Sequence, residues 1–540
     1  MWEKLYIYRR RFLYTICFFT FCLIDQRTRT LSGLDGWLET FRDLSATVMA
    51  ILILSHYHLG DFKKRKLPYL AWTLICAIGG AVFLAKGQSL AVFLNNRIVL
   101  TLNGFLLGVI LIQLFIAVVL DKQRPKLNKY FAWSWLAMML LMIVSRSDYW
   151  WPFVYLIMFG CFYLTNYTQE EQKDLFQGML DGIILSFFLM QGWCFVFRPY
   201  DTVRYRGVYA NCSNNALFYL VVLAAVLTKL FYVYRKKCSK WIKICYWLGV
   251  GTLLTFLFLT ISRTGWMTAA VLVFVALLFL RTVTACRNYF WSVVKYSLVT
   301  ILCFSLTFPL VFSAVRYLPP AFHHPVWFWG EWNEDKVHSW DKWNSEKFVD
   351  LDEFLHTTLA RAVRIVDPSF RLADQKTEDT PIFEAELPEI TPRQQQLYDE
   401  MLAAGFAMDP ADIGNSVLVR KNIYRYYAHL LNFRGHPSSE QNFQMFPNYN
   451  YGHAHNIYLQ YGVDFGIPVM ILFTLLVVWS GIGFVSQFRK ERSEQPVGYL
   501  LFLLVPAVFG LLEFCWGNGS ITITLLFVVW RRMIRNEAGK

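Results

Sequence analysis

The chain has 540 residues, of which 56% are hydrophobic, 18% aromatic and only 17% charged, and its mean hydropathy is +0.36. This composition excludes a soluble globular protein and predicts an all-α polytopic membrane protein. The net charge of +14 does not indicate a nucleic-acid partner, because in a membrane protein an excess of Lys and Arg mostly marks the loops that stay in the cytoplasm.

Apolar segments occur along most of the chain. A membrane span needs roughly 20 apolar residues, and fewer where flanking side chains reach the interface. By this criterion we expect about 12 to 14 transmembrane helices. They are placed at 12–24, 44–60, 67–85, 98–120, 130–144, 150–167, 177–197, 214–234, 242–261, 265–280, 291–314, 456–484, 497–515 and 520–531.

Basic residues predict how these helices are oriented. If the amino terminus is cytoplasmic, the segments YRRR, DFKKRK, DKQRPK, RKKCSKWIK, FRKER and RRMIR all fall on the cytoplasmic side. Lys and Arg concentrate in cytoplasmic loops of membrane proteins, so this orientation is the expected one.

One long polar segment, 315–454, interrupts the series and falls on the outer side. It holds 20 of the 38 acidic residues against 13 Lys and Arg, so it is acidic while the rest of the chain is basic. Three amphipathic patterns within it, at 350–366, 391–407 and 416–433, predict helices. We therefore expect eleven spans in 1–314, a large, mainly helical external loop domain in 315–454, and three spans in 455–540.

Three polar clusters directly precede helices that run from the outer to the inner side. They are "RYRGVYANCSNNALF" at 204–218, "ISRTGW" at 261–266 and "YGHAHNIYLQYGVDFGIP" at 451–468. Helix amino termini favour anions, because their N–H groups are unpaired and the dipole is positive there. Arg206 and Arg263 add full charges, and guanidinium groups bind phosphate oxygens well. The clusters predict an outer site for a phosphate or diphosphate; the alternative is that each arginine only reaches lipid headgroups.

The third cluster also contains a candidate base. His455 can accept a proton near neutral pH, whereas Asn456 is more simply a helix cap. A metal site would use His453 and His455 with a third ligand such as His436, but no Cys or carboxylate stands near in sequence, so we expect no metal.

Weaker candidates lie elsewhere in the sequence. The acidic triplet at 350–352 resembles a cation-binding motif of glycosyltransferases, and the Trp-rich stretch 327–343 is typical of either a membrane interface or a sugar-stacking surface. Asp181, Asp464 and Glu513 lie near predicted helix ends and do not form the mid-membrane relay of a proton-coupled pump.

These motifs, in this order, resemble the bacterial O-antigen ligase and O-antigen polymerase superfamily. His455-Asn456 is followed by nine residues and Gly466, as in that family's signature, although Val469 departs from the residue usual three positions later. "SRTGW" resembles its Ser-Arg segment, and "RGVYANCSNN" resembles its Arg-Gly segment, with Cys and Ser in place of a Pro. "SVLVRKNIY" resembles the external helix that contains a functional arginine, here Arg420.

The resemblance implies a polyprenyl-diphosphate-dependent glycosyltransferase in the bacterial cytoplasmic (inner) membrane. A glycan would pass from a polyprenyl diphosphate carrier to the hydroxyl of an acceptor glycan or lipid at the outer face, without metal or cofactor. Arg206 and Arg263 would hold the diphosphate, and His455 would deprotonate the acceptor. The other expected substrate-binding residues are Arg204, Asn211, Ser262, Arg420, His453 and Asn456.

A transporter or flippase of lipid-linked oligosaccharides is the alternative. It too needs many helices and phosphate-binding arginines. It also predicts charges in the middle of the membrane and two pseudo-repeated halves, and neither is visible in the sequence.

Overall fold

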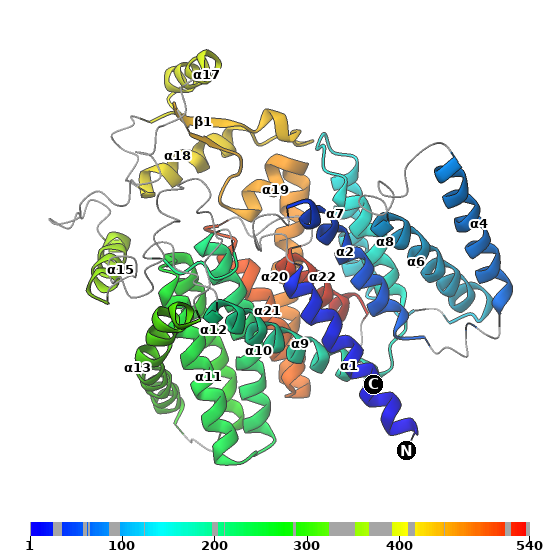
Figure 1. Cartoon of the computed structure of the whole chain (residues 1–540), viewed down its shortest axis with the longest axis horizontal. Helices are drawn as coiled ribbons and strands as arrows, with labels where there is room; N and C mark the ends of the chain where they lie inside the picture. Colours follow the sequence, from blue (N-terminus) through cyan, green and yellow to red (C-terminus); the bar gives the residue numbers. More distant parts are fainter. Residues whose placement is uncertain are drawn as a thin grey trace.

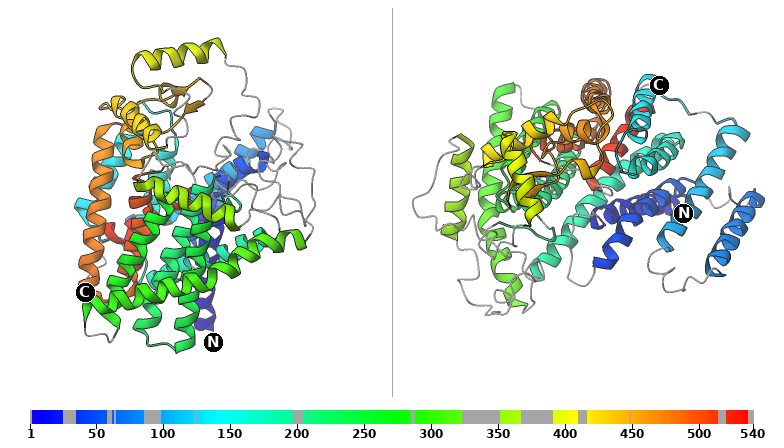
Figure 2. Two further views of the ribbon diagram at one scale, coloured as in Figure 1. Left: turned by 90° about the vertical axis from the view of Figure 1, so that its left-hand side faces the viewer. Right: turned by 90° about the horizontal axis from the view of Figure 1, so that it is seen from above.

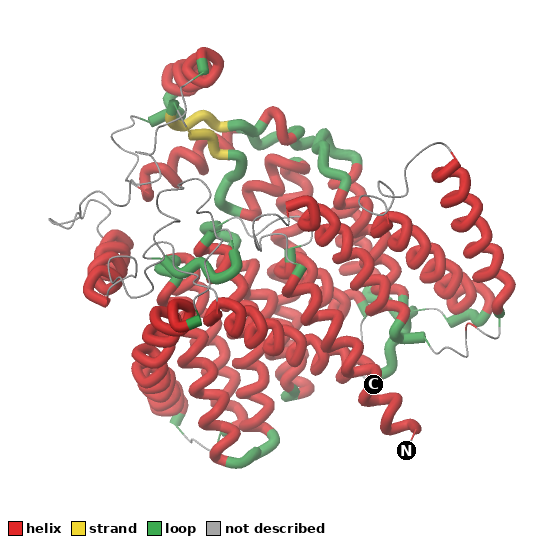
Figure 3. The backbone as a smooth tube through the Cα atoms, in the orientation of Figure 1, coloured by secondary structure: helices red, strands yellow, loops and turns green. Residues whose placement is uncertain are grey.

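The computed structural model of the chain describes residues 2–24, 35–57, 62, 65–85, 98–123, 125–196, 204–209, 211–284, 288–322, 351–366, 391–408, 416–447, 449–513 and 520–535. Helices dominate this part of the chain, with two short strands (Figure 3). The acidic triplet begins at Asp350 and the Trp-rich stretch spans 327–343, so neither expectation can be placed within the described residues.

The bundle consists of helices joined mostly by short turns (Figure 1). In its amino-terminal part the helices are α1 (Trp2–Leu23), α2 (Asp35–Leu54), α4 (Lys66–Ala85), α6 (Ile98–Phe115) with its π-helical end (Ile116–Leu120), α7 (Lys129–Ile143), α8 (Trp151–Leu164) and α9 (Gln169–Val196). Then follow α10 (Cys212–Arg235), α11 (Lys240–Leu259), α12 (Arg263–Leu280), η3 (Arg281–Val283) and α13 (Tyr289–Ala321). The last helices are α19 (Ile457–Phe465), α20 (Ile467–Glu491), α21 (Glu494–Phe509) and α22 (Ile521–Ile534).

Seven of the described helices are long and apolar enough to cross a membrane, and several shorter apolar helices accompany them. The seven begin at Thr101, Gln169, Cys212, Lys240, Arg263, Phe290 and Ile467. Each overlaps with a segment predicted from hydropathy. The chain is therefore an all-α, multi-pass membrane protein.

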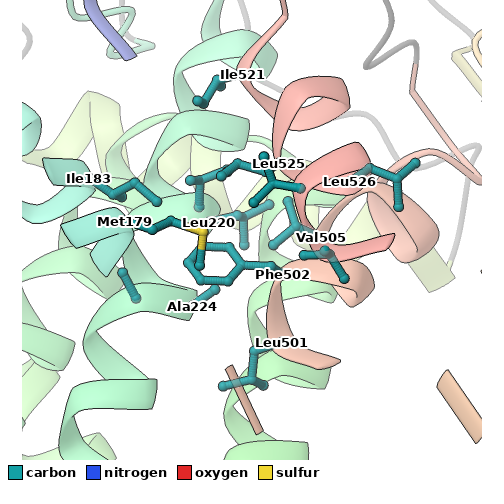
Figure 4. Packing of buried hydrophobic residues seen from close by; sticks show 14 of the residues in the cluster. Met179, Ile183, Leu220, Ala224, Leu501, Phe502, Val505, Ile521, Leu525 and Leu526 are labelled. Carbon is teal, nitrogen blue, oxygen red and sulfur yellow. The ribbon is translucent and has the colours of Figure 1, made fainter. Parts of the chain in front are cut away.

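Helix α10 lies at the centre of the bundle. Its apolar window is 94% buried, far more than that of the other long helices, because neighbours cover it on all sides. Leu220 and Ala224 of α10 pack against Met179 and Ile183 of α9, and Phe502 of α21 approaches from another side (Figure 4). Helix α10 is thus surrounded by protein, whereas the other long apolar helices leave half or more of their apolar windows unburied.

The two ends of the bundle differ. At one end Arg235, the last residue of α10, forms a 2.7 Å ion pair with Glu494, the first residue of α21. The opposite end of α21 is tied to the segment before α19, since the Ile457 N–H donates to the Gly510 carbonyl at 2.7 Å. That end also carries the small domain described next, and we call it the cap end.

The cap consists of α17 (Pro392–Ala403), α18 (Ser416–His429), the 3-10 turn Ser438–Glu440, and the antiparallel strands β1 (Phe443–Phe446) and β2 (Tyr449–Tyr451) (Figures 1 and 2). Its own apolar core includes Tyr427 and Phe443, with Val463 of α19. Helix α15 (Leu351–Val366) lies beside α13 and packs on it through Phe354. The segments expected to be helical are confirmed, whereas the strand pair was not predicted.

The cap is anchored to the turn between α7 and α8. The Arg146 side chain donates to Glu440 at 2.9 Å and its N–H donates to the Arg434 carbonyl at 2.9 Å. Asp148 accepts from the N–H and the hydroxyl of Ser438. These contacts fix the cap over the end of the bundle that α7 reaches.

The prediction of one continuous helix at 456–484 is wrong. The chain breaks at Gly466, which has φ +100° and ψ 159° and separates α19 from α20. A Cβ atom at this position would lie 2.2 Å from the Phe433 carbonyl oxygen, and the Ile467 N–H donates to the Asn432 carbonyl at 2.8 Å. The cap backbone therefore occupies the space that a straight helix would need.

Candidate functional site

The two arginine motifs lie side by side at the cap end. The Tyr205 N–H donates to the Leu259 carbonyl at 3.0 Å, and Arg204 Nε donates to the Thr260 carbonyl at 3.2 Å. The helices that follow also touch at their starts, because a Cβ on Gly265 would lie 3.0 Å from Cβ of Ala216. The segment 204–209 and the turn 260–263 therefore form one surface, which we call the arginine half of the site.

Hydrogen bonds hold the arginine half in shape. The Asn211 side chain caps α10 by accepting from the Ser213 N–H at 2.7 Å, and Ser262 caps α12 by accepting from the Gly265 N–H at 3.2 Å. Ile261 has φ +47°, a strained value for a β-branched residue, and this conformation turns the chain sharply from α11 into α12. Asn211 and Ser262 thus have structural roles as caps, and a cap position also puts them at helix amino termini.

Arg206 and Arg263 are both half-buried on this surface. Arg263 is the first residue of α12, and the Arg206 carbonyl accepts from the Tyr209 N–H at 3.2 Å within a turn. Arg263 therefore lies at a helix amino terminus, where the helix dipole adds to its positive charge, and Arg206 lies in the turn that precedes α10.

The histidine motif forms a second cluster, the histidine half, around Glu513. His455 Nδ1 lies 3.3 Å from Glu513 Oε2, and Arg420 Nη2 donates to Glu513 Oε1 at 2.5 Å. Burial raises the pKa of the Glu513 carboxyl, but the hydrogen bond from His455 and the charge of Arg420 outweigh burial and hold the pKa below its usual value. Glu513 is therefore ionised at neutral pH and bridges the two residues.

Glu513 also determines which ring nitrogen of His455 is exposed for chemistry. A carboxylate beside Nδ1 favours the tautomer that has its proton on Nδ1 and a lone pair on Nε2. Nε2 has no hydrogen-bond partner among the described residues. The His455 backbone has φ +47°, and such strained conformations are typical of functional sites.

His453 packs edge-on against His455, with 4.2 Å between the ring centroids. Burial, and to a smaller extent the neighbouring His455, lower the pKa of His453 to about 3. His453 is therefore neutral at physiological pH, and its Nδ1 accepts from the His455 N–H at 3.4 Å. It supports the His455 backbone and does not share the proton chemistry.

The loop 453–456 is fastened to the residues that follow α21. Asn456 caps α19 by accepting from the Leu459 N–H at 3.0 Å, and its amide donates to the Leu511 carbonyl at 3.0 Å. The Tyr424 hydroxyl of α18 lies 3.3 Å from the His455 carbonyl and 3.4 Å from the Leu511 carbonyl. The interpretation of Asn456 as a helix cap is thus confirmed, and α18, the loop and residues 510–513 form one unit.

The possible third metal ligand lies in a different network. His436 Nδ1 is 2.7 Å from Glu440 Oε2, and Nε2 contacts the Leu430 carbonyl at 2.8 Å. In the described part of the chain, no group of three His, Cys, Asp or Glu side chains is placed to hold a metal ion.

Both halves lie at the same end of the bundle. Helix α21 packs along α10 and α12, runs antiparallel to α10, and ends at the residues that hold His455 (Figure 1). The arginine half stands at the starts of α10 and α12. Arg204, Arg206, Asn211, Ser262 and Arg263 thus lie in one half, and Arg420, His453, His455 and Asn456 lie in the other, with α21 in contact with the helices of both.

The contact of Glu513 with His455 was not predicted from the sequence, which indicated only an acidic residue near a helix end. One signal was available: an isolated carboxylate directly after an apolar helix, on the side to which the histidine motif had been assigned. Comparison with known proteins gives no further guidance, because no protein-family model, curated protein or solved structure matches this chain.

Proposed function

We propose that this chain is a membrane glycosyltransferase of the O-antigen ligase or polymerase type. It transfers a glycan from a polyprenyl diphosphate carrier to an acceptor hydroxyl at the outer face of the bacterial cytoplasmic membrane. In this proposal about 12 to 14 helices span the membrane and the cap is the external domain. The observation that carries the proposal is the His455–Glu513 pair, which lies at the same bundle end as the two arginine motifs.

The chemistry follows from the two halves. The acceptor hydroxyl gives its proton to Nε2 of His455, and its oxygen forms a bond to the anomeric carbon of the glycan. The bond from that carbon to the diphosphate oxygen breaks, and the diphosphate leaves with the electron pair. Arg206 and Arg263 stabilise the negative charge that develops on the leaving group. Glu513 stabilises the imidazolium formed at His455.

The remaining polar residues support these steps. Arg204 bonds the Thr260 carbonyl and so fixes the segment that carries Arg206. Arg420 holds Glu513 in place. Polar headgroups of the donor would enter between the arginine half and the histidine half, with the polyprenyl chain remaining among membrane lipids.

Reconstitution tests the proposal. The full chain in vesicles receives a polyprenyl-diphosphate-linked glycan and an acceptor glycan, and new glycosidic bonds are measured. The His455→Ala, Arg206→Ala and Arg263→Ala variants should each lose transfer by about 100-fold or more while remaining folded. The matched control is His429→Ala, an exposed histidine at the end of α18, which should retain wild-type transfer.

Two results would contradict the proposal. Wild-type transfer by the His455→Ala variant would remove the assigned base. Movement of the lipid-linked glycan across the vesicle membrane without any new glycosidic bond would favour the transporter alternative.

A further inference from the structure

A second basic site lies at the end of the bundle opposite the cap. A cavity of about 430 Å³ is lined by Arg281, Thr282, Phe488, Arg489 and Arg492. Arg281 begins the 3-10 turn after α12, Arg489 lies in the last turn of α20, and Arg492 follows that helix. Three guanidinium groups from two helices thus surround one cavity.

The base of this cavity is apolar and well packed. Phe488 is only 6% exposed, and its ring meets Phe279 of α12 edge-on at 4.6 Å between centroids and Phe231 of α10 at 5.9 Å. The aromatic contacts close the space between α10, α12 and α20 at this level. The cavity therefore has a rigid apolar base and a cationic rim.

The carboxylates closest in sequence to this rim are bound to other arginines. Glu491 pairs with Arg532 at 2.7 Å, and Glu494 pairs with Arg235 at 2.7 Å. The positive charge around the cavity is therefore not balanced by these two residues. Like charges gathered in one cavity repel each other, and a bound anion relieves that repulsion.

One face of α20 connects the cavity to the surface that faces lipid. Leu475, Ile482 and Arg489 are spaced seven residues apart, so they lie on the same side of the helix. Leu475 is 56% and Ile482 is 66% exposed, as expected for side chains that contact acyl chains. An acyl chain along this face leads directly to the guanidinium of Arg489.

We propose that this cavity binds the phosphate headgroup of an anionic phospholipid. Arginines bind phosphate oxygens in a bidentate way, and basic pockets between membrane helices are suited to such headgroups. The apolar face of α20 favours a lipid over a free phosphate ion. The site goes beyond the proposed transfer reaction, and it joins the far ends of α12 and α20, helices whose other ends adjoin the two halves of the candidate site.

Lipid binding to the full chain in detergent micelles tests this inference. Native mass spectrometry measures the affinity for phosphatidylglycerol and for phosphatidylcholine. Wild type should bind phosphatidylglycerol more tightly. The triple variant Arg281→Gln, Arg489→Gln, Arg492→Gln should bind phosphatidylglycerol at least about tenfold more weakly than wild type. Its affinity for phosphatidylcholine should be unchanged. The single variant Arg489→Gln should lose about threefold, and it provides the test if the triple variant does not fold.

A charge-matched control distinguishes binding at this cavity from general electrostatic attraction between anionic lipids and a basic surface. Lys129, Lys236 and Lys240 are exposed at the same end of the bundle, and changing all three to Gln should alter the affinity by less than about twofold. Equal loss in this control, or unchanged affinity in the arginine variants, would overturn the proposal. Displacement of phosphatidylglycerol by millimolar inorganic phosphate would also overturn it, because the ligand would then be a free anion.

Discussion

The carboxylate of Glu513 lies 3.3 Å from Nδ1 of His455 through Oε2, although 58 residues separate the two in the sequence. Its other oxygen accepts from Arg420 at 2.5 Å, so one carboxylate, whose side chain is 14% exposed, ties the histidine to α18 of the cap. A carboxylate in this position orients an imidazole and stabilises its protonated form. The first two predictions test this bridge.

Changing Glu513 to Gln should slow transfer and leave substrate binding intact. The amide keeps the size of the side chain but removes the charge that stabilises imidazolium at His455. We expect kcat to fall by about 10- to 100-fold with KM nearly unchanged. Steady-state kinetics in reconstituted vesicles measure both constants. An equal fall in the kcat of a Glu440→Gln control, whose carboxylate pairs with Arg146 and His436, would show that loss of any cap carboxylate has this effect.

Changing Arg420 to Gln should destabilise the cap end. The variant leaves the largely buried Glu513 carboxylate without its closest charged partner, which costs about 1 to 3 kcal/mol. Arg425 lies on the same helix but is exposed, so Arg425→Gln should cost less than about 0.5 kcal/mol. Thermal unfolding in detergent measures both. A comparable loss in the two variants would argue against a specific role for the Arg420–Glu513 pair.

His453 should contribute a loss of stability as the pH drops from 7 towards 5, whereas Asp464, whose pKa is raised to about 7 by burial, contributes in the opposite direction. The pKa of His453 in the folded protein is about 3, below the value of about 6.5 in an unfolded chain. The unfolded state therefore takes up a proton first, and stability is lost as the pH falls below about 6.5, by at most about 1.4 kcal/mol per pH unit.

Asp464 is the same in both proteins, so the variant His453→Gln should gain stability relative to wild type as the pH falls from 7 to 5. Glu513 also has a lowered pKa, but its contribution is lost only below the usual glutamate value of about 4.3, so the window from pH 7 to pH 5 separates the two groups. Unfolding temperatures measured across the window provide the check. The same slope in wild type and variant would refute the assignment to His453.

Changing Gly466 to Ala should disrupt the junction between α19 and α20. The backbone conformation at Gly466 is essentially restricted to glycine and strains any other residue by about 1 to 3 kcal/mol. The new Cβ would also overlap the Phe433 carbonyl. A lower unfolding temperature and reduced transfer are expected together.

Gly160 in α8 provides the control for this glycine variant. A Cβ atom added there meets no atom within 4 Å, so Gly160→Ala should be neutral or slightly stabilising. If the two alanine variants unfolded at the same temperature, the strain at Gly466 would be refuted.

Much of the helical bundle was predictable because hydropathy alone determines which segments cross a membrane. The segments 214–234, 242–261 and 265–280 correspond closely to α10, α11 and α12. Hydropathy did not predict the break at Gly466, because it is the same for one helix or two. Gly466 followed by Pro468 in the first turn of α20 was a local signal for it. The strand pair 443–451 was also missed. Its aromatic residues are buried against α18, and this contact cannot be inferred from the local sequence pattern.

The candidate site was predictable in part. Hydropathy and charge bias assigned the three motifs to one side, and the structure brings Arg204 and the turn at Thr260 into direct contact. The sequence places the isolated Glu513 carboxylate on the side of the histidine motif but does not predict its contact with His455, because that contact depends on how α21 ends against the loop before α19. Long-range pairings of this kind require three-dimensional information.

The attachment of residues 453–456 to the end of α21 has an evolutionary consequence. The spacing between the imidazole and the carboxylate is set by the loop 453–456, residues 510–513 and α18, whereas α17 packs on β1 (Figure 2). Substitutions in α17 can therefore accumulate without altering the reacting groups. Under the proposed function, sequence changes that alter the accepted glycan are expected first in α17, the outermost helix of the cap, and last in the turn after α21.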